Sequence, residues 1–529
     1  MGKDDNSILK NTGIMTIATM LSRVTGLLRM WAMAFALGNT LITSAYQVAN
    51  NVPNAIFDLV AGGLLGTAFL PIYLLQKEKQ GRAGSDRFAS NILNLTLIVL
   101  GVITILATVF AGPVIATQTF TQSVDAEVRE TAVFFFRIFA VQVLFYGLGG
   151  VVAGVLNANR VYGLPALSPM FNSVCVIVSM FAYVPISAVN PQLALVVIAV
   201  GTTLGVLVQF AVQIPALMKI DFKWQPVVDL RDPALKEAMR IAIPTFIYIA
   251  GVLIAFSCRN AFSLQTGDTG ASTLFYAWMW YQLPYGVVAV SISTAFLTEM
   301  SDAVSRNDFE ELRGHVQQGL RSTLFLIIPM AGLMAAMSAP IIQLFRSGAF
   351  QQDDVVFVSS ILVVWVLSLP FYAGQMYFYR VFAALRQFMT FALVSCGLVV
   401  VQIGLYWLLC SIDLVGLYGV PAADFVYFGL MFATMAIILR KRVGAFGFPS
   451  ILLMCAKVTV ATALAAVGIL ILFYFMPYQP SILDGLLRIT LGGIVGIAII
   501  FAVCKLLKVS EMEIVSGIIK KLFARFKRH

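Results

Sequence analysis

Long apolar windows constrain the fold of this chain more than any other feature of its sequence. Fourteen of them follow one another between residues 11 and 507, each bounded by polar residues or by Gly and Pro. About 20 apolar residues suffice for an α-helix to cross a bilayer. Because 60% of the residues are hydrophobic and only 11% are charged, a soluble enzyme and a disordered chain are excluded. We therefore expect an all-α polytopic membrane protein.

The expected helices are separated by short polar connections, none of which is long enough to form a soluble domain. Their approximate ranges are 11–37, 44–76, 91–113, 131–155, 165–187, 193–218, 239–263, 272–299, 320–345, 355–380, 388–410, 414–439, 451–476 and 485–507. The second window is longer than a bilayer requires. It is therefore expected to be tilted, kinked at Pro53 or broken.

Basic residues fall mostly on one side of these helices. Of the 35 Lys and Arg residues, 27 lie at the termini and in the connections of one side, whereas the opposite connections hold only Arg129 and Arg346. By the positive-inside rule, both termini are cytoplasmic and the number of spans is even. The net charge of +10 therefore orients the protein and does not indicate nucleic-acid binding. The basic segment 508–529 is expected to be an amphipathic helix on the cytoplasmic leaflet, with a solvated tail as the alternative.

An internal repeat is visible in the sequence. Gly66–Leu70 recurs as Ser293–Leu297, 227 residues later, and each copy follows an upstream Tyr and Pro. The offset spans six helices, so the repeat predicts two parallel six-helix lobes around a central site. The expected organisation is an N-terminal lobe at 1–230, a C-terminal lobe at 231–445, two extra C-terminal helices at 446–507 and the tail at 508–529.

Three arginines lie deep inside predicted spans, namely Arg23, Arg29 and Arg259. A charge at the centre of a span costs about 2.5–3.5 kcal/mol or more on insertion scales, which a water-filled cavity offsets. Arg23 and Arg29 lie about 120° apart around one helix, so both can line a broad cavity. Guanidinium groups match phosphate well, which predicts an anionic substrate. The alternative is that these arginines pair with helix C-termini or with Asp58 as packing elements.

Two carboxylates and several helix-breaking residues also lie within the spans. Asp58 is either a partner of the arginines or a cation-coupling group, and Asp424 is a second coupling candidate. Residues that weaken or bend the second and eighth helices predict a hinge or gate; they are Pro53, Asn54, Gly62, Gly63, Pro284 and Gly286. Close packing of small residues is the competing interpretation.

Motifs for catalysis or metal binding are not found in the sequence. There is no P-loop, no G-x-S-x-G and no H-E-x-x-H pattern, and the six cysteines lie in apolar stretches without a C-x-x-C pair. We therefore expect no cofactor, no metal site and no enzymatic activity. Transport must then be driven by an ion gradient, by the membrane potential or by the gradient of the substrate itself.

Several motifs, taken together and in order, resemble a known family. Ser22–Arg29 is similar to the S-R-x-x-G-x-x-R opening of the MurJ/MviN lipid II flippases, which belong to the multidrug/oligosaccharidyl-lipid/polysaccharide exporter superfamily. Further similar motifs are Val52–Asn54, Ala68–Pro71, Leu344–Phe350 and Phe378–Arg386. The resemblance covers helices 1 to 12, and fourteen helices is the family number.

The resemblance implies that the chain moves lipid-linked peptidoglycan precursor from the inner to the outer leaflet of the bacterial cytoplasmic membrane by alternating access. The essential helix-1 arginines of the family correspond to Arg23 and Arg29. The chain departs from the family pattern at Phe57 and Met279, where many members have arginine in helices 2 and 8. Arg259 is expected to replace some of that positive charge.

Other functions and partners follow from the same features. A flippase for another undecaprenyl-linked oligosaccharide would need the same arginines, whereas a drug/cation antiporter would need carboxylates facing the cavity. Some family members bind sodium through helices 7, 11 and 12, but helix 11 here offers little beyond Ser395 and Gln402 for such a site. Expected partners are the precursor with its pyrophosphate head group, membrane lipids, a coupling ion and cell-wall synthesis proteins.

Overall fold

The computed structural model describes the backbone of residues 3–60, 69–121 and 124–512, and the side chains of residues 18–55, 69–121 and 124–512. Throughout these ranges the regular secondary structure is helical, without any strand. Ten helical stretches in the described residues are long and apolar enough to cross a membrane, and two bent helix pairs meet the same criteria jointly. The chain is therefore an all-α polytopic membrane protein, as its hydropathy predicts.

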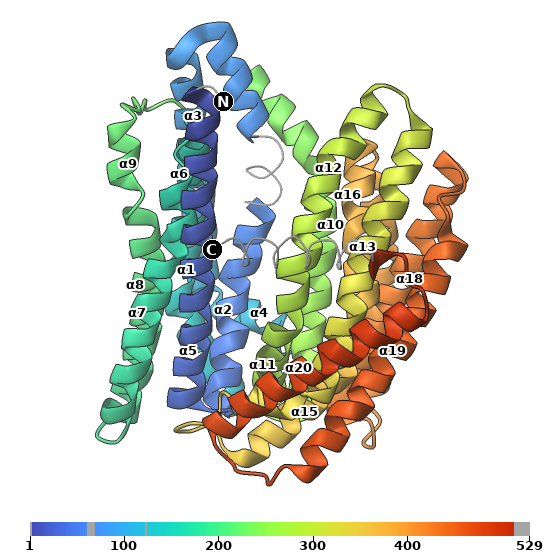
Figure 1. Cartoon of the computed structure of the whole chain (residues 1–529). Coiled ribbons are helices and arrows are strands. Elements are labelled where there is room, and N and C mark those ends of the chain that lie inside the picture. The colour runs from blue at the N-terminus through green and yellow to red at the C-terminus, as the bar shows by residue number, and fades with distance from the viewer. Residues whose placement is uncertain (1–2, 61–68, 122–123, 513–529) are drawn as a thin grey trace. The chain divides into compact units, whose positions relative to one another are not determined.

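The chain divides into two compact units (Figure 1). Unit 1 is Met1–Ser272 together with Ser347–Phe350, and unit 2 is Thr273–Arg346 together with Gln351–His529. The helices of unit 1 are α1 (Lys3–Leu37), α2 (Leu41–Val60), α3 (Leu70–Val109), α4 (Ala111–Ala116), α5 (Ala126–Phe139), α6 (Gln142–Ala158), α7 (Gly163–Ser187), α8 (Pro191–Ala211), α9 (Ile214–Lys219) and α10 (Pro233–Gln265). The unit ends within the first turn of α11.

Unit 2 contains the remaining helices. They are α11 (Gly270–Pro284), a π-helical segment (Tyr285–Ala289), α12 (Val290–Ser305), α13 (Phe309–Ala336), α14 (Ser338–Gln343), α15 (Gln352–Val366), α16 (Leu369–Ala384), α17 (Phe388–Cys410), a short 3-10 turn (Gly416–Tyr418), α18 (Gly419–Val443), α19 (Phe448–Phe475) and α20 (Ile482–Leu506). The sequence repeat places α10 in the C-terminal lobe, whereas α10 lies in the compact unit 1. A division by compactness is not a division by internal repeat, so the lobe boundaries stay a prediction.

Small residues allow close packing in both units. In unit 1, a Cβ atom at Gly201 of α8 would lie 2.3 Å from the Ser179 Cβ of α7. In unit 2, a Cβ atom at Gly332 of α13 would lie 2.1 Å from the Thr462 Cγ2 of α19. Close backbone approach of this kind is how helices associate in lipid, where apolar side chains gain little from leaving the solvent.

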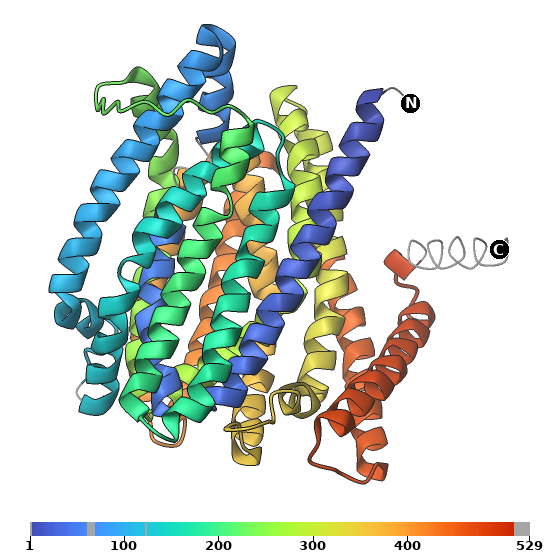
Figure 2. The ribbon, with the colours of Figure 1, turned by 90° about the vertical axis from the view of Figure 1, so that its left-hand side faces the viewer.

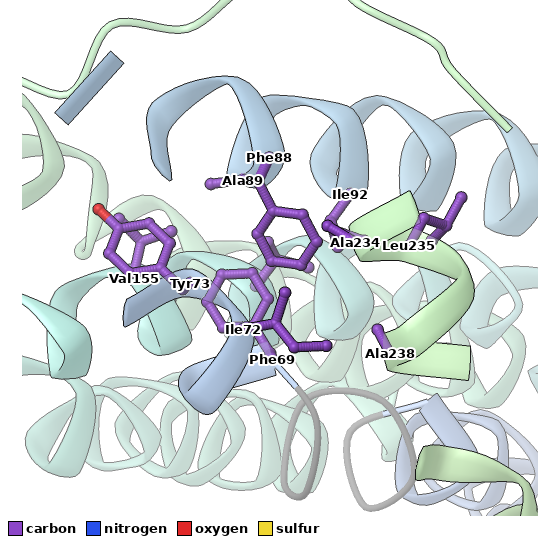
Figure 3. Packing of buried hydrophobic residues seen from close by; sticks show 11 residues of the cluster. Phe69, Ile72, Tyr73, Phe88, Ala89, Ile92, Val155, Ala234, Leu235 and Ala238 are labelled. Carbon is purple, nitrogen blue, oxygen red and sulfur yellow. The ribbon is translucent and has the colours of Figure 1, made fainter. Parts of the chain in front are cut away.

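Helix α3 changes direction at Gly81, whose φ of 68° lies in the left-handed region. The helix therefore has two arms, 70–80 and 82–109, and the polar residues between two predicted spans form the bend. Residues near both arms share one buried cluster with α6 and α10 (Figure 3). Its members are Phe69, Ile72, Tyr73, Phe88, Ala89, Ile92, Val151, Val155, Ala234, Leu235 and Ala238. The cluster attaches the first turns of α10 to unit 1.

Some residues singled out from the sequence lie outside the described part of the chain. These are the Asp58 side chain, Gly62, Gly63 and residues 513–529 of the basic tail. The roles predicted for them stay predictions.

Candidate functional site

Arg23 and Arg29 project from α1, six residues apart, or about 9 Å along the helix axis. Arg23 is exposed and Arg29 is half-buried. Between them, the Thr25 hydroxyl donates 3.0 Å hydrogen bonds to the carbonyl oxygens of Leu21 and Ser22, so its polarity is satisfied within the helix. The two guanidinium groups are therefore the prominent polar groups of this stretch of α1.

Arg29 lies within electrostatic range of the Tyr46 hydroxyl of α2. Tyr46 is buried, and its hydroxyl forms a 2.9 Å hydrogen bond with Thr202 of α8. The Tyr46 ring also contacts Phe135 and Phe139 of α5, with ring centroids 5.7 and 5.3 Å away. This arrangement was missed from the sequence, because a tyrosine in an apolar window is typical of a buried core residue. Tyr46, Phe135 and Phe139 form a buried aromatic cluster within electrostatic range of one predicted binding arginine.

Arg259 belongs to α10, six residues before the helix ends, and only 7% of its surface is exposed. Its guanidinium carbon lies 4.0 Å from the centre of the Phe256 ring, a favourable cation–π distance. The neighbouring residues Ser257 and Asn260 bind the Gln118 side chain at 2.9 and 2.7 Å. This end of α10 is thus attached to the segment after α4, and Arg259 is a buried cation of unit 1.

Asp424 is the best-defined buried carboxylate of unit 2, with 2% of its surface exposed. Three uncharged donors bind it: Trp365 Nε1 at 2.9 Å, Gln402 Nε2 at 2.7 Å and the Tyr406 hydroxyl. The Gln402 Oε1 atom is buried beside this carboxylate and accepts no hydrogen bond. Trp365 and Tyr406 were missed from the sequence, although Gln402 and Tyr406 are four residues apart and so share one face of α17. Within the described residues, no group of three His, Cys, Asp or Glu side chains could hold a metal ion.

Two of the predicted hinge residues are prolines that lie inside or at the end of a helix, Pro53 and Pro284. Pro53 is buried inside α2. Pro284 ends α11, and the π-helical segment Tyr285–Ala289, which includes Gly286, follows it directly. π-helical turns interrupt regular α-helical hydrogen bonding and are frequent at functional sites. The span departs from α-helical geometry here, and its use as a hinge stays a prediction.

Comparison with known protein families gives a match over most of the chain. Residues 33–488 match the model of the family described as lipid II flippase MurJ. A protein of Synechocystis named "Probable lipid II flippase MurJ" is 28% identical over 397 residues, 73% of each chain. The "Lipid II flippase MurJ" of Burkholderia cenocepacia is 26% identical over 373 residues, covering 68% of this chain and 72% of the relative.

Solved structures show the same fold. A lipid II flippase MurJ in an inward closed conformation superposes with a TM-score of 0.76 at 23% identity, covering 93% of this chain and 99% of the other. An inward-facing multidrug transporter of the MATE family gives a TM-score of 0.62 at 17% identity, over 79% and 98% of the two chains. The family match covers far more than half of the sequence. This chain therefore belongs to the MurJ lipid II flippase family.

Proposed function

We propose that this protein is a lipid II flippase of the bacterial cytoplasmic membrane. It moves the undecaprenyl-pyrophosphate-linked peptidoglycan precursor from the inner to the outer leaflet by alternating access between two lobes. The observation that carries the proposal is the family match over residues 33–488. The lipid II flippases named among its relatives support the same substrate.

Arg23 and Arg29 are the groups proposed to bind the pyrophosphate. Their spacing along α1 would let both guanidinium groups contact one pyrophosphate. Charge-assisted hydrogen bonds to phosphate are stronger than hydrogen bonds between neutral groups. Arg259 is proposed as a third source of positive charge. The polyprenyl tail would stay in lipid while the head group crosses.

The proposed topology has fourteen spans with both termini in the cytoplasm. Helices α1 and α2 would add two spans to the twelve that length and hydropathy identify in the described residues. Their lower apolar content is explained if they line the substrate cavity and not lipid. Pro53 and Pro284 would then lie in the inner helices of the two lobes, where bending opens and closes access.

Asp424 is proposed as the coupling group of unit 2. A buried carboxylate surrounded by uncharged donors, with an unused amide oxygen beside it, is suited to bind a proton or a small monovalent cation. Binding of a proton or cation would neutralise the buried charge of Asp424 where α17 and α18 meet. This change in charge would link an ion gradient to the movement of the lobes.

Depletion and complementation in a bacterium test the substrate and the arginines together. Depleting the protein is expected to leave lipid II in the inner leaflet, as measured by its accessibility to an external probe. The variants Arg23→Ala and Arg29→Ala should fail to restore this exposure, while Arg87→Ala, at an exposed position of α3, should restore it. Unchanged lipid II exposure on depletion would exclude the proposed substrate, and full rescue by both α1 variants would exclude the proposed binding residues.

A further inference from the structure

The connection between α9 and α10 is fixed along the outside of α3 (Figure 2). Within it, residues 222–230, here called the strap, run alongside the second arm of α3. The Asn91 amide bonds Asp229 in both directions: its nitrogen donates to the Asp229 carbonyl at 2.9 Å, and its oxygen accepts from the Asp229 N–H at 2.8 Å. The Asn94 nitrogen donates to the carbonyls of Gln225 and Val227, each at 2.8 Å.

Two further side chains of α3 complete this attachment. The Ser90 hydroxyl accepts from the Gln225 N–H at 3.0 Å, and an Asp86 oxygen accepts from the Lys223 N–H at 3.3 Å. At 100° per residue, the side chains of α3 that bind the strap lie within about 140° of one another. Phe88 and Ile92, which face the buried cluster, lie on the opposite side of the helix. The strap therefore covers the outer face of α3.

The polarity of the strap is the reverse of that expected for a connection in water. Apart from Lys223 at its start, its exposed side chains are apolar: Trp224, Pro226, Val228 and Leu230, with exposed fractions of 59% for Trp224, 53% for Val228 and 69% for Leu230. Its backbone N–H and C=O groups bond to α3, and the side chains of Gln225, Val227 and Asp229 between the exposed ones are half-buried. Such an apolar edge is unfavourable in water and favourable against lipid.

The position of the strap along α3 gives the depth at which this edge lies. Beyond Asn94 the same face of α3 continues with Leu97 and Ile98, which are 48% and 50% exposed and belong to a strongly apolar span. Leu97 follows Asn94 by about 4.5 Å of helix rise. Trp224 donates from Nε1 to Asn94 Oδ1 at 2.9 Å while its ring stays exposed. A tryptophan with a satisfied N–H and an exposed ring is typical of the membrane–water interface.

We propose that the strap is a lipid-binding element that sits in the interface of the leaflet at this end of α3. Trp224, Val228 and Leu230 enter the region of the acyl carbonyl groups, and the exposed Lys219 and Lys223 contact anionic head groups. The positive-inside pattern makes this the cytoplasmic leaflet. The occupant is bulk membrane lipid, so the proposal does not depend on which substrate the protein moves.

Tryptophan quenching in liposomes tests this position with the full-length protein. The protein is reconstituted in phosphatidylcholine and phosphatidylglycerol carrying bromine near the acyl carbonyl, and the emission of Trp224 is obtained by subtracting the variant W224F, since the chain has six tryptophans. We expect brominated lipid to remove most of the Trp224 emission and aqueous iodide to remove little. Val228→Trp in the otherwise unchanged protein is a second probe that does not require W224F to fold.

Glu310→Trp, at an exposed position of the first turn of α13, is the matched control and should be quenched by iodide. Lys219→Gln combined with Lys223→Gln should reduce the dependence of Trp224 quenching on phosphatidylglycerol. Quenching of Trp224 and of the Val228→Trp probe by iodide and not by brominated lipid would overturn the proposal. Protection of both probes from both quenchers would also overturn it, because it would indicate a protein partner on this edge.

Discussion

Gly38 and Ala349 are in backbone contact within unit 1: a Cβ atom on Gly38 would lie 2.4 Å from the Ala349 carbonyl oxygen. Gly38 follows α1 directly and has a φ of +64°. The Ala349 N–H donates a 2.9 Å hydrogen bond to the Phe35 carbonyl in the last turn of α1. Gly348 approaches the same carbonyl, with a φ of +57° and a hypothetical Cβ 2.3 Å from it. Two glycines therefore let the segment Ser347–Phe350 close over the end of α1.

Replacing Gly38 with alanine is expected to destabilise the protein. The left-handed conformation alone costs a non-glycine residue about 1–3 kcal/mol, and the clash with Ala349 adds to this. We expect a clearly lower thermal unfolding temperature in detergent. The control is Gly397→Ala in α17, where a Cβ meets no atom within 4 Å and better helix propensity should stabilise slightly. Equal unfolding temperatures of Gly38→Ala and the unmodified protein would contradict the predicted contact.

Replacing Asn91 with alanine is expected to detach part of the strap from α3. Both hydrogen bonds between Asn91 and Asp229 are lost, and the freed backbone groups of Asp229 must find water. Hydrogen exchange in residues 222–230 should therefore become faster, by an amount that corresponds to about 1–3 kcal/mol of local stability. Gln80→Ala, at an exposed position of the first arm of α3, should leave this exchange unchanged. Unaltered exchange in Asn91→Ala would mean that packing, and not these bonds, fixes the strap.

Asp424→Asn separates a coupling role from a structural one. Asparagine keeps the size of the side chain and one acceptor, so we expect the variant to fold with a moderately lowered unfolding temperature. The NH₂ group of the new asparagine replaces one accepting oxygen of Asp424. It therefore faces another donor, either Trp365 or the pair Gln402 and Tyr406, and one hydrogen bond is lost. Because the variant cannot change charge, we expect lipid II transport in liposomes to lose its dependence on an ion gradient. Asp413→Asn, at an exposed position, is the control.

Full gradient-dependent transport by a well-folded Asp424→Asn variant would exclude coupling through this carboxylate. Asp424→Ala should be less stable than Asp424→Asn, because all three donors then lose their acceptor inside the protein.

Apolar windows were sufficient to locate most spans. The range 388–410 coincides with α17, and 165–187 differs from α7 by two residues at one end. Burial in lipid sets these helices, and hydropathy measures that directly. The polar connection expected between residues 77 and 90 is instead helical on both sides of a bend at Gly81.

Contacts between segments distant in the sequence could not be predicted in this way. The strap has no helical or strand periodicity, and its backbone is satisfied by side chains of α3 that lie about 130 residues earlier. Likewise, the deep arginines were identified by their cost in lipid, but that cost does not say that the end of α10 beside Arg259 binds Gln118 or that Arg29 lies within electrostatic range of Tyr46. Such pairings depend on tertiary packing, which a single sequence does not encode locally.

The ion pair between Asp484 and Arg488 at the start of α20 allows a double-mutant test of buried charge. The two groups are 2.9 Å apart, and each side chain is 7% exposed. Arg488 also donates to the carbonyls of Met476 and Pro477, at 3.0 and 3.2 Å. Removing the carboxylate with Asp484→Ala leaves a buried cation and should cost about 3–5 kcal/mol of unfolding free energy.

Arg488→Met should be costly as well, because Asp484 is then left as a buried anion and two carbonyls lose a donor. The double variant Asp484→Ala with Arg488→Met removes both charges, so we expect it to be more stable than the sum of the single effects predicts by about 1–3 kcal/mol. Denaturant or thermal unfolding in one detergent provides all four values of the cycle. Additive effects would show that the two charges are solvated separately and that the pair does not hold the start of α20.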